Sequence, residues 1–505
     1  MRKPLVPLLL SILMATPASA APDALPMVRI ETLLRAPADQ STPIAAFAST
    51  LRQAAAELAQ LADLPAAPPL QLATLPGTLP PFPAGHPAQV TSGDLQIALT
   101  QLAIHTGANG QLLLVQAQAG KKDAIFLREG HSTLAEVAAA AADNALTLQG
   151  DTWHLTRPLV VWADAGLMLQ PGDQLEIDRA SGAFLLAFGR LDLMGADVSA
   201  GGDANTAAAD FAPFVLVTGQ GSLVAQNMQF SALGFGGSDM FGGIAVVGRG
   251  LFQPAFPPVL INNHFTDIGR VALVGTKNAL FSGNLIDAPR SGGVSIVGGT
   301  GLSLVGNTVR ASRSGSAIRL ADVKDTTVAG NLVAGSAQNG LTVEGISRDL
   351  TLADNVIVAN GGTGVAITRS DCIAAHGNII GNNGAAGMRL RASGSYHLTQ
   401  NALLLNHTAG LDVQRQKPGT SGHVQANVFA GNREGMRGAN IGEVLLSDNR
   451  LDAQLPRLFG GEFTQYLPGF LTSMQQHDAT EFRIALAGRD TAQATSLAQS
   501  TCQPE

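Results

Sequence analysis

Hydrophobic and polar residues alternate in short stretches through the middle of the chain. Apolar side chains take every second place in segments such as 318–320, 341–343 and 411–413. A period of two residues predicts β-strands, and no unit of this region holds ten residues of helical periodicity. We therefore expect many short strands that each bury one face.

The same region repeats one short phrase, an asparagine with apolar residues one or two places after it. The phrase recurs every 21 to 26 residues, at Asn263, Asn284, Asn307, Asn331, Asn355, Asn378, Asn401, Asn427 and Asn449. A period of this length indicates a solenoid. Three short strands and tight turns fit into about 23 residues at ~3.3 Å per strand residue. The predicted fold is all-β, a right-handed parallel β-helix.

The repeated asparagines have a structural interpretation. Asparagine tolerates the left-handed backbone that a tight turn requires. Stacked rung upon rung, the nine side chains are expected to form a structural ladder in which each amide bonds to the rungs above and below. Losing one such buried partner costs about 1–3 kcal/mol.

The remaining chain divides around this solenoid. Residues 1–20 have the charged start, apolar core and small-residue end of a secretory signal, with cleavage expected after Ala20. Residues 21–92 are Ala/Pro-rich, with a helix expected at 42–62 and an extended linker at 65–87. Because solenoid ends are exposed strand edges that need covering, we assign 93–165 to an N-terminal α/β cap, 166–455 to the β-helix and 456–505 to a short C-terminal cap.

Composition and charge limit the partners. No stretch outside the signal is long and apolar enough for a membrane span, so a periplasmic or secreted protein is expected. The net charge of −7 argues against nucleic acid, which needs a basic face. Residues 290–417 nevertheless carry eleven Arg and Lys against seven Asp and Glu. This excess indicates an anionic ligand, or it is scattered solubilising charge.

Several stretches before and within the rungs carry a resemblance to a known family. They are segments 124–130, 150–173, 181–198 and 211–235, followed in order by the asparagine rungs. Together, residues 124–330 resemble the periplasmic mannuronan C5-epimerases of alginate biosynthesis. The resemblance implies a right-handed β-helix, conversion of mannuronate to guluronate within the polymer, and association with a periplasmic export or modification complex.

The catalytic motif of that family is missing. The resemblance implies an Asp-Pro-His-Asp motif on the rung that corresponds to residues 293–298, where alternation points Ser295 and Val297 outward. Removing the C5 proton of a uronate needs a base, an acid on the opposite face and a cation at the carboxylate. Cations are available in this chain, but the histidine is absent.

Outward strand positions and strand ends of later rungs supply the candidate substrate-binding residues. These are Arg319, Asp322, Glu344, Arg369, Arg389, Arg391, Asp412 and Arg415. Adjacent rungs lie about 4.8 Å apart, and arginine grips carboxylates with two hydrogen bonds. The set is interpreted as a binding surface for an acidic polysaccharide, as solvated side chains that offset one another, or as a catalytic site.

The sequence gives little evidence for a metal site or a cofactor site. Four histidines, His376, His397, His407 and His423, are expected in turns rather than in one strand column, so they predict no metal site. Asp322, Glu344 and Asp412 are not all on consecutive rungs, which disfavours calcium. No nucleotide loop is visible, and no cofactor is expected. Cys372 and Cys502 are the only cysteines and could pair.

Two classes of function follow. The first is a periplasmic or secreted relative of the epimerases that binds an anionic, alginate-like exopolysaccharide without epimerase chemistry. The second is an active C5-epimerase or lyase that acts on a uronate polymer with an outward arginine and a carboxylate. A purely structural surface β-helix is a third interpretation, which holds if no polymer binds.

Overall fold

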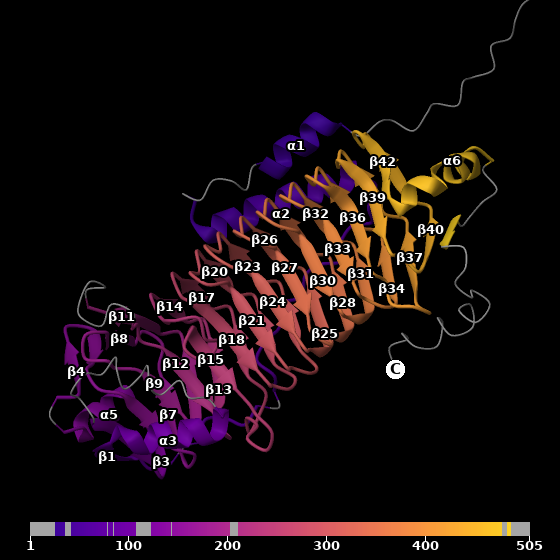
Figure 1. Cartoon of the computed structure of the whole chain (residues 1–505). Helices are drawn as coiled ribbons and strands as arrows, with labels where there is room; N and C mark the ends of the chain where they lie inside the picture. Colours follow the sequence, from indigo (N-terminus) through magenta and orange to yellow (C-terminus); the bar gives the residue numbers. More distant parts are fainter. Residues whose placement is uncertain are drawn as a thin grey trace, which may run out of the picture.

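A computed structural model describes residues 26–35, 42–77, 79–83, 85–107, 123–142, 144–202, 211–476 and 482–485. Within these ranges the chain winds into a long right-handed parallel β-helix, as the sequence predicted (Figure 1). Each rung contributes one short strand to each of three sheets. Consecutive strands of a sheet are therefore parallel and one rung apart, except for the antiparallel pairs β1–β2, β4–β5 and β40–β43 in the end regions.

The three sheets contain 15, 14 and 14 strands among the described residues. Sheet A consists of β1 (Gln89–Asp94), β2 (Asp123–Arg128), β6 (Leu159–Val161), β9 (Leu185–Ala187), β12 (Val215–Thr218), β15 (Gly243–Val247), β18 (Arg270–Val274), β21 (Val294–Val297), β24 (Ile318–Ala321), β27 (Leu341–Glu344), β30 (Val365–Thr368), β33 (Met388–Arg391), β36 (Ala409–Gln414), β39 (Glu434–Ala439) and β42 (Arg457–Gly461).

Sheet B consists of β3 (Gly130–Thr133), β7 (Ala165–Leu169), β10 (Arg190–Met194), β13 (Ser222–Gln226), β16 (Val259–Ile261), β19 (Leu280–Ser282), β22 (Ser303–Val305), β25 (Lys324–Ala329), β28 (Arg348–Ala353), β31 (Asp371–His376), β34 (Tyr396–Thr399), β37 (Ser421–Gln425), β40 (Glu443–Ser447) and β43 (Phe482–Ala485). Sheet C consists of β4 (Leu146–Gln149), β5 (Thr152–Leu155), β8 (Gln174–Asp178), β11 (Asp197–Gly201), β14 (Gln229–Ser231), β17 (His264–Thr266), β20 (Leu285–Asp287), β23 (Thr308–Arg310), β26 (Leu332–Ala334), β29 (Val356–Val358), β32 (Ile379–Gly381), β35 (Ala402–Leu404), β38 (Val428–Ala430) and β41 (Arg450–Asp452).

The core consists of inward side chains that stack on the same position of the next rung. In sheet A, for example, one column runs through Val294, Ile318, Leu341, Val365 and Met388. All five are buried. Because strand alternation sends every second residue inward, the apolar positions of the sequence fill this core and the positions between them face outward.

The turn between sheets B and C contains a continuous ladder of buried amides. From Asn263 to Asn449, the side-chain nitrogen of each asparagine donates to the side-chain oxygen of the next one, over 2.8–3.1 Å. The same oxygen also accepts from the backbone N–H of the preceding asparagine, as Asn355 does from Asn331 at 3.0 Å. The amides thus fix the distance and register between rungs.

A second ladder lies in the turn between sheets C and A. It runs through Asn360, Asn383, Asn406 and Asn432, with amide-to-amide bonds of 3.0 Å. Ser336 donates its backbone N–H to one end, and the side chain of Gln454 accepts at the other. The sequence analysis did not include this set, although its spacing of 23 to 26 residues repeats that of the first ladder.

The N-terminal arm, described at residues 26–35 and between 42 and 88, runs along the outside of the β-helix. Its helices α1 (Met27–Arg35) and α2 (Ile44–Leu61) cover the later strands of sheet C (Figure 1). Apolar outward residues of that sheet, including Leu332, Val356 and Leu404, are buried against them. The arm therefore completes a second, external hydrophobic core.

The proline-rich segment 65–87 is not a free linker but lies along the turns between sheets B and C. Leu70 and Leu72 pack on Gly306 and Gly330, where an added Cβ would stand 2.4 Å from a leucine methyl carbon. Both glycines also have positive φ, 67° and 62°, which side chains disfavour. Further along, Arg190 donates to the carbonyl oxygens of Pro80 and Pro81 at 2.7 and 2.9 Å.

Caps cover both ends. At the first rungs lie α3 (Leu95–Thr106) and α5 (Leu134–Ala140), the latter opened by the capping box of Thr133 and Glu136. Strands β2, β3 and β6 already belong to the sheets, so the stacked rungs begin before residue 166. The last rungs are covered by η2 (Glu462–Tyr466), α6 (Leu467–Gln476) and β43.

The signal predicted at 1–20 and the short strand that the sequence also indicates at 111–116 lie outside the described ranges. The sequence also indicates an amphipathic turn at 479–486, but the described residues of that segment, 482–485, form strand β43 instead. Among the described residues, no helix has both the length and the apolar character needed to cross a membrane.

Substitution of Asn331 by alanine should lower the free energy of unfolding by about 1–3 kcal/mol, because it leaves buried partners in two rungs unbonded. Chemical denaturation measures this change. Gln425→Ala, which removes an exposed amide on β37, is the control and should change stability little. Equal stability of the Asn331 variant and wild type would contradict the structural role of the ladder.

Candidate functional site

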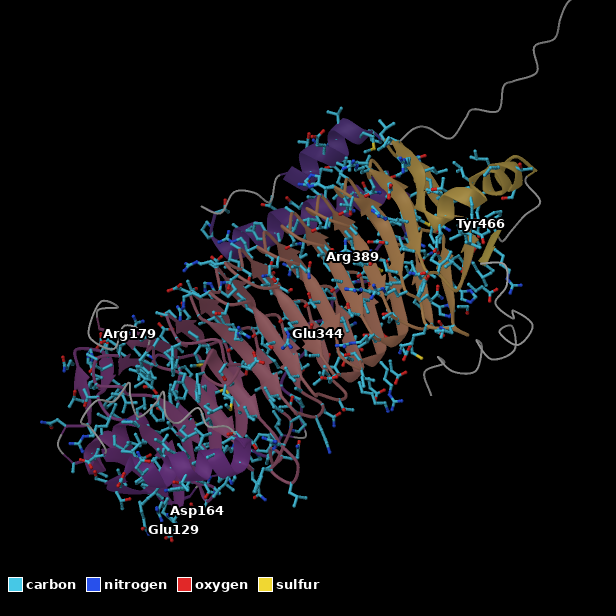
Figure 2. The ribbon with its side chains drawn as sticks, in the orientation of Figure 1. Glu129, Asp164, Arg179, Glu344, Arg389 and Tyr466 are labelled. Atoms are coloured by element: carbon cyan, nitrogen blue, oxygen red, sulfur yellow. The ribbon has the colours of Figure 1, made fainter. Side chains whose placement is uncertain are left out.

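The outward residues of sheet A form two columns along the axis of the β-helix. The first column contains Ala272, Ser295, Arg319, Thr342, Ala366, Arg389, Asp412 and Arg437 in register. The second contains Val274, Val297, Ala321 and Glu344, and continues with Thr368, Arg391, Gln414 and Ala439. Figure 2 locates Glu344 and Arg389 on this face.

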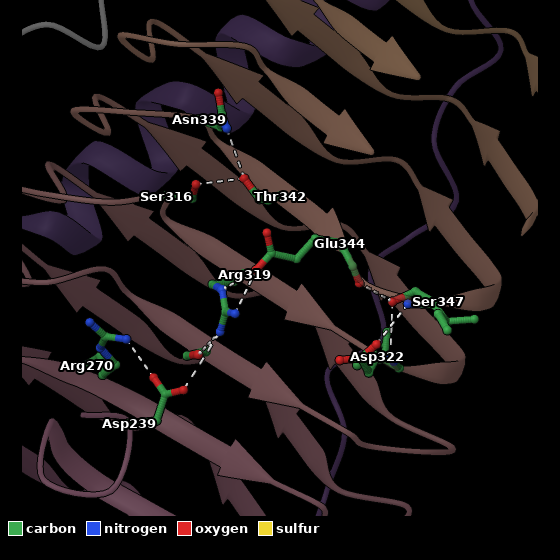
Figure 3. A network of polar contacts seen from close by, with 12 residues as sticks. Asp239, Arg270, Ser316, Arg319, Asp322, Asn339, Thr342, Glu344 and Ser347 are labelled. Carbon is green, nitrogen blue, oxygen red and sulfur yellow. Dashed lines mark hydrogen bonds and ion pairs between the residues drawn. The ribbon is translucent and has the colours of Figure 1, made fainter. Parts of the chain in front are cut away.

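Acidic and basic side chains form a chain of ion pairs on the earlier rungs of this surface (Figure 3). Asp239, from the segment between β14 and β15, accepts from Arg270 at 2.6 Å and lies 3.8 Å from Arg319. Arg319 in turn donates to Glu344, with both Nε and Nη2 at 2.7 Å from Oε1. Its remaining nitrogen lies 3.3 Å from the Ser295 hydroxyl. Arg319 is therefore held in place by three neighbouring groups.

A pocket of about 350 Å³ lies over this network. Hydroxyl and amide groups line one wall, where Ser316 and Thr342 are 2.7 Å apart and Asn339 donates to Thr342 at 3.1 Å. Arg270, Arg319 and Glu344 line the rest. The pocket thus combines charged groups that recognise carboxylates with polar groups that recognise hydroxyls.

A second hollow of about 690 Å³ continues along sheet A. The strand ends at Val247, Val274 and Val297 contribute to its lining, together with Asp239 and the cations Arg249 and Lys277. Asp239 also bonds the arginines of the first pocket. We call the two hollows together the sheet A groove.

Further along the first column, Arg389 and Asp412 form a second ion pair. Nε of Arg389 lies 3.0 Å from Oδ2 of Asp412, which also accepts from Gln414 at 2.7 Å. Asp412 is only 3% exposed, and its other carboxylate oxygen has no hydrogen-bond partner among the described residues. In this pair the carboxylate is buried, whereas the Arg389 side chain is 34% exposed.

Three exposed arginines lie further along sheet A on consecutive rungs, and we call them the arginine ridge. Arg391 ends β33, while Arg369 and Arg415 occupy the turn from sheet A to sheet B with φ of 58° and 51°. The Arg369 N–H donates to the Arg391 carbonyl at 2.9 Å, which places them on adjacent rungs. None of the three has an ion-pair partner within the described parts of the chain.

The structure brings some of the predicted site residues together and separates others. Arg319 contacts Glu344, and Arg389 contacts Asp412. Asp322 lies in the turn and accepts from the Ile346 N–H at 2.8 Å, which is a backbone contact.

Sequence reasoning missed Asp239, Arg270, Ser316 and Asn339. Asp239 belongs to a non-repeating segment, and Ser316 and Asn339 precede strands. Strand alternation could therefore not place these three, whereas it places Arg270 outward on β18, two residues before Ala272.

The position expected to carry the family's catalytic motif faces the groove without it. Ser295 and Val297 are outward on β21 and line the two hollows. The residues that line the groove include no histidine, tyrosine or cysteine among the described parts of the chain. Its carboxylates, Asp239 and Glu344, are both engaged by arginines. The groove therefore offers hydrogen bonding and charge, and its described residues lack the histidine that the family resemblance implies.

The prediction that the histidines lie in turns was wrong for three of them, because His376 ends β31 and His397 and His423 lie in β34 and β37. His397 and His423 face each other in one column of sheet B, with ring centroids 4.6 Å apart and planes at 3°. Alternation in β34 and β37 places both on the same face. Burial, with a smaller effect of His423, lowers the pKa of His397. No group of three or more His, Cys, Asp or Glu is arranged for a metal in the described residues. Cys372 is disulfide-bonded, and Cys502 lies outside the described ranges.

Comparisons with known proteins agree with this architecture. The family model "Right handed beta helix region" matches residues 242–403. The mannuronan C5-epimerase of Pseudomonas putida is 22% identical over 328 residues, which cover 60% of this chain and 62% of that protein. The chain thus matches less than two thirds of the length of this relative.

Among solved structures, the periplasmic alginate epimerase AlgG has a TM-score of 0.63 at 17% identity, with 75% of this chain and 94% of that one covered. The chain is an AlgG-like right-handed β-helix. A single-substitution mutant of AlgG gives a TM-score of 0.64 at 18% identity, over 78% of this chain and 98% of the mutant. The resemblance inferred from sequence is confirmed. At 17–18% sequence identity, the structural comparison establishes the fold of this chain.

His397, which stacks on His423, predicts a pH dependence of stability. Its pKa is lower in the folded than in the unfolded state, where it is about 6.5. Below that pH the unfolded state binds more protons, so stability should fall as the pH decreases through about 6.5 and be unaffected by this group above about 7.5. Thermal unfolding at pH ~5.5 and ~8 should show a smaller acid loss for His397→Gln. His407→Gln, at an exposed turn, should retain the full loss.

Proposed function

We propose that this AlgG-like β-helix is an exported, periplasmic protein that binds an acidic, uronate-containing polysaccharide along the outer face of sheet A and does not epimerise it. The observation that carries the proposal is the arginine ridge on successive rungs of sheet A, further along the axis from a groove lined by hydroxyl and amide groups. The named relatives are alginate or mannuronan epimerases, which supports a uronate polymer as the ligand. Membership of an export complex rests on the family resemblance alone.

The arginine ridge is the part of this surface that is free to bind. Arg319 and Arg389 already have carboxylate partners, whereas Arg369, Arg391 and Arg415 are exposed and unpaired in the described structure. Rungs repeat every ~4.8 Å, so the ridge presents positive charge at regular intervals along the axis. An extended polymer with one carboxylate per sugar fits such a series. Each exposed contact contributes at most about 1 kcal/mol, and a long chain adds several of them.

The groove supplies contacts of a different kind. Thr342, Ser316 and Asn339 present hydroxyl and amide groups on one side, and Val274 and Val297 present an apolar floor on the other. Sugar rings have hydroxyl edges and apolar faces, so both walls match them. The ridge would favour negatively charged polymers, and the groove would contact their sugar rings.

The composition of the groove argues against epimerase chemistry. A C5-epimerase needs a base on one face of the sugar and an acid on the other. Here Ser295 and Val297 stand where the family resemblance requires the catalytic motif. The alternative, an active epimerase or lyase, is favoured only by the presence of Glu344 beside Arg319.

Incubation of the purified protein with polymannuronate should produce no guluronate and no unsaturated chain ends. Proton NMR measures the first, and ultraviolet absorbance the second. Appearance of either product would contradict the binding-only proposal. In that case, loss of the product in Glu344→Gln would identify the carboxylate beside Arg319 as the group that acts.

The double variant Arg391→Ala/Arg415→Ala should bind alginate up to about 30-fold more weakly, given two contacts of about 1 kcal/mol each. Affinity electrophoresis at low salt measures this, and binding should fall as salt screens the charges. Lys324→Ala/Arg348→Ala removes the same charge from sheet B and serves as the control. Equal retention of the two variants would exclude the ridge as the binding surface.

A further inference from the structure

We propose that the early strands of sheet C form a second saccharide-binding site, selective for neutral sugars. Two columns of polar side chains run along this outer face, over β8, β11, β14 and β17. One contains Gln174, Asp197, Gln229 and His264, and the other Glu176, Ser199, Ser231 and Thr266. They line a hollow of about 280 Å³, which we call the sheet C recess.

The recess begins where the N-terminal arm ends. On later rungs the same two columns hold apolar residues such as Leu332 and Ala334, or Val356 and Val358, and these are buried under α1 and α2. The change occurs at Arg310, which bonds Asp287 through two nitrogens and also donates to the Thr42 carbonyl. The polar section is therefore not needed to hold the arm, and no described residue of the arm lines it.

Most hydrogen-bonding capacity in the recess is unused. Thr152 donates to Gln174 at 3.2 Å, and His264 lies 3.2 Å from Thr266. One oxygen of Glu176 lies 3.1 Å from Nδ1 of His154. The side chains of Asp197, Ser199, Gln229 and Ser231 make no hydrogen bond within the described structure. Carboxylate, amide and hydroxyl groups thus face one hollow on consecutive rungs, and each can bond to ligand hydroxyls.

The charge of the lining residues determines which class of saccharide the sheet C recess can bind. The recess contains two carboxylates, Glu176 and Asp197, and no lysine or arginine among its described lining residues. Burial lowers the pKa of His264, which favours its neutral form, and Arg310 is already paired with Asp287. A uronate would be repelled here, whereas a neutral sugar donates its hydroxyls to the carboxylates. The recess therefore has the opposite charge preference to the arginine ridge, and it does not depend on the function proposed for sheet A.

The test uses four neutral probes, the hexasaccharides of cellulose, laminarin, mannan and N-acetylated chitin, together with polymannuronate. Saturation-transfer NMR and calorimetry are applied to wild type, to Gln174→Ala/Gln229→Ala and to Arg391→Ala/Arg415→Ala. Both glutamines are exposed, so the variant should fold, and thermal unfolding checks that it does. We expect at least one neutral hexasaccharide to bind wild type and the arginine variant equally, and the glutamine variant at least tenfold more weakly.

Two results would overturn the proposal. One is that none of the four neutral probes binds wild type, and the other is that the glutamine variant binds as well as wild type. Polymannuronate reports separately on the ridge, because only the arginine variant should weaken its binding. Failure of one site is thus distinguishable from failure of the other.

Discussion

The stacking of buried amides in the turns is the constraint on which the rest of the molecule depends. Each ladder asparagine bonds to the next rung through both its backbone and its side chain. This locks the register of neighbouring strands, and a slip of one residue would exchange the inner and outer faces of a sheet. The outward columns of sheets A and C exist only because that register is kept over many rungs.

With the register fixed, the three outer faces are free to differ. Sheet A carries arginines and a groove, and the later part of sheet C is apolar and covered by α1 and α2. The early part of sheet C is polar and open. The core is similar throughout, so changes at outward positions alter binding with little effect on the fold. Such a scaffold can keep its fold while outward residues at positions such as Ser295 and Val297 change.

The repeating part of the molecule was predictable because its signals are local. Alternation around Arg319 and Ser295 places both outward, and the regular spacing of the asparagines indicates the rungs. The features that were not predicted depend on contacts between residues distant in sequence. Asp239 reaches Arg270 and Arg319 from a segment without a repeat. Residues 65–87 were expected to be a linker because proline excludes regular structure, yet Leu70 and Leu72 pack on turn glycines more than 200 residues away.

The path of the arm has a consequence for the order in which the chain can fold. Leu34 packs on Gly381, Met27 on Gly431, and Asp63 pairs with Arg450. The first helices to be synthesised thus dock on some of the last rungs to be made. Until those rungs exist, the apolar faces of α2 and of sheet C are both exposed, and such surfaces favour aggregation. Closure of the arm is therefore a late step that reports completion of the solenoid.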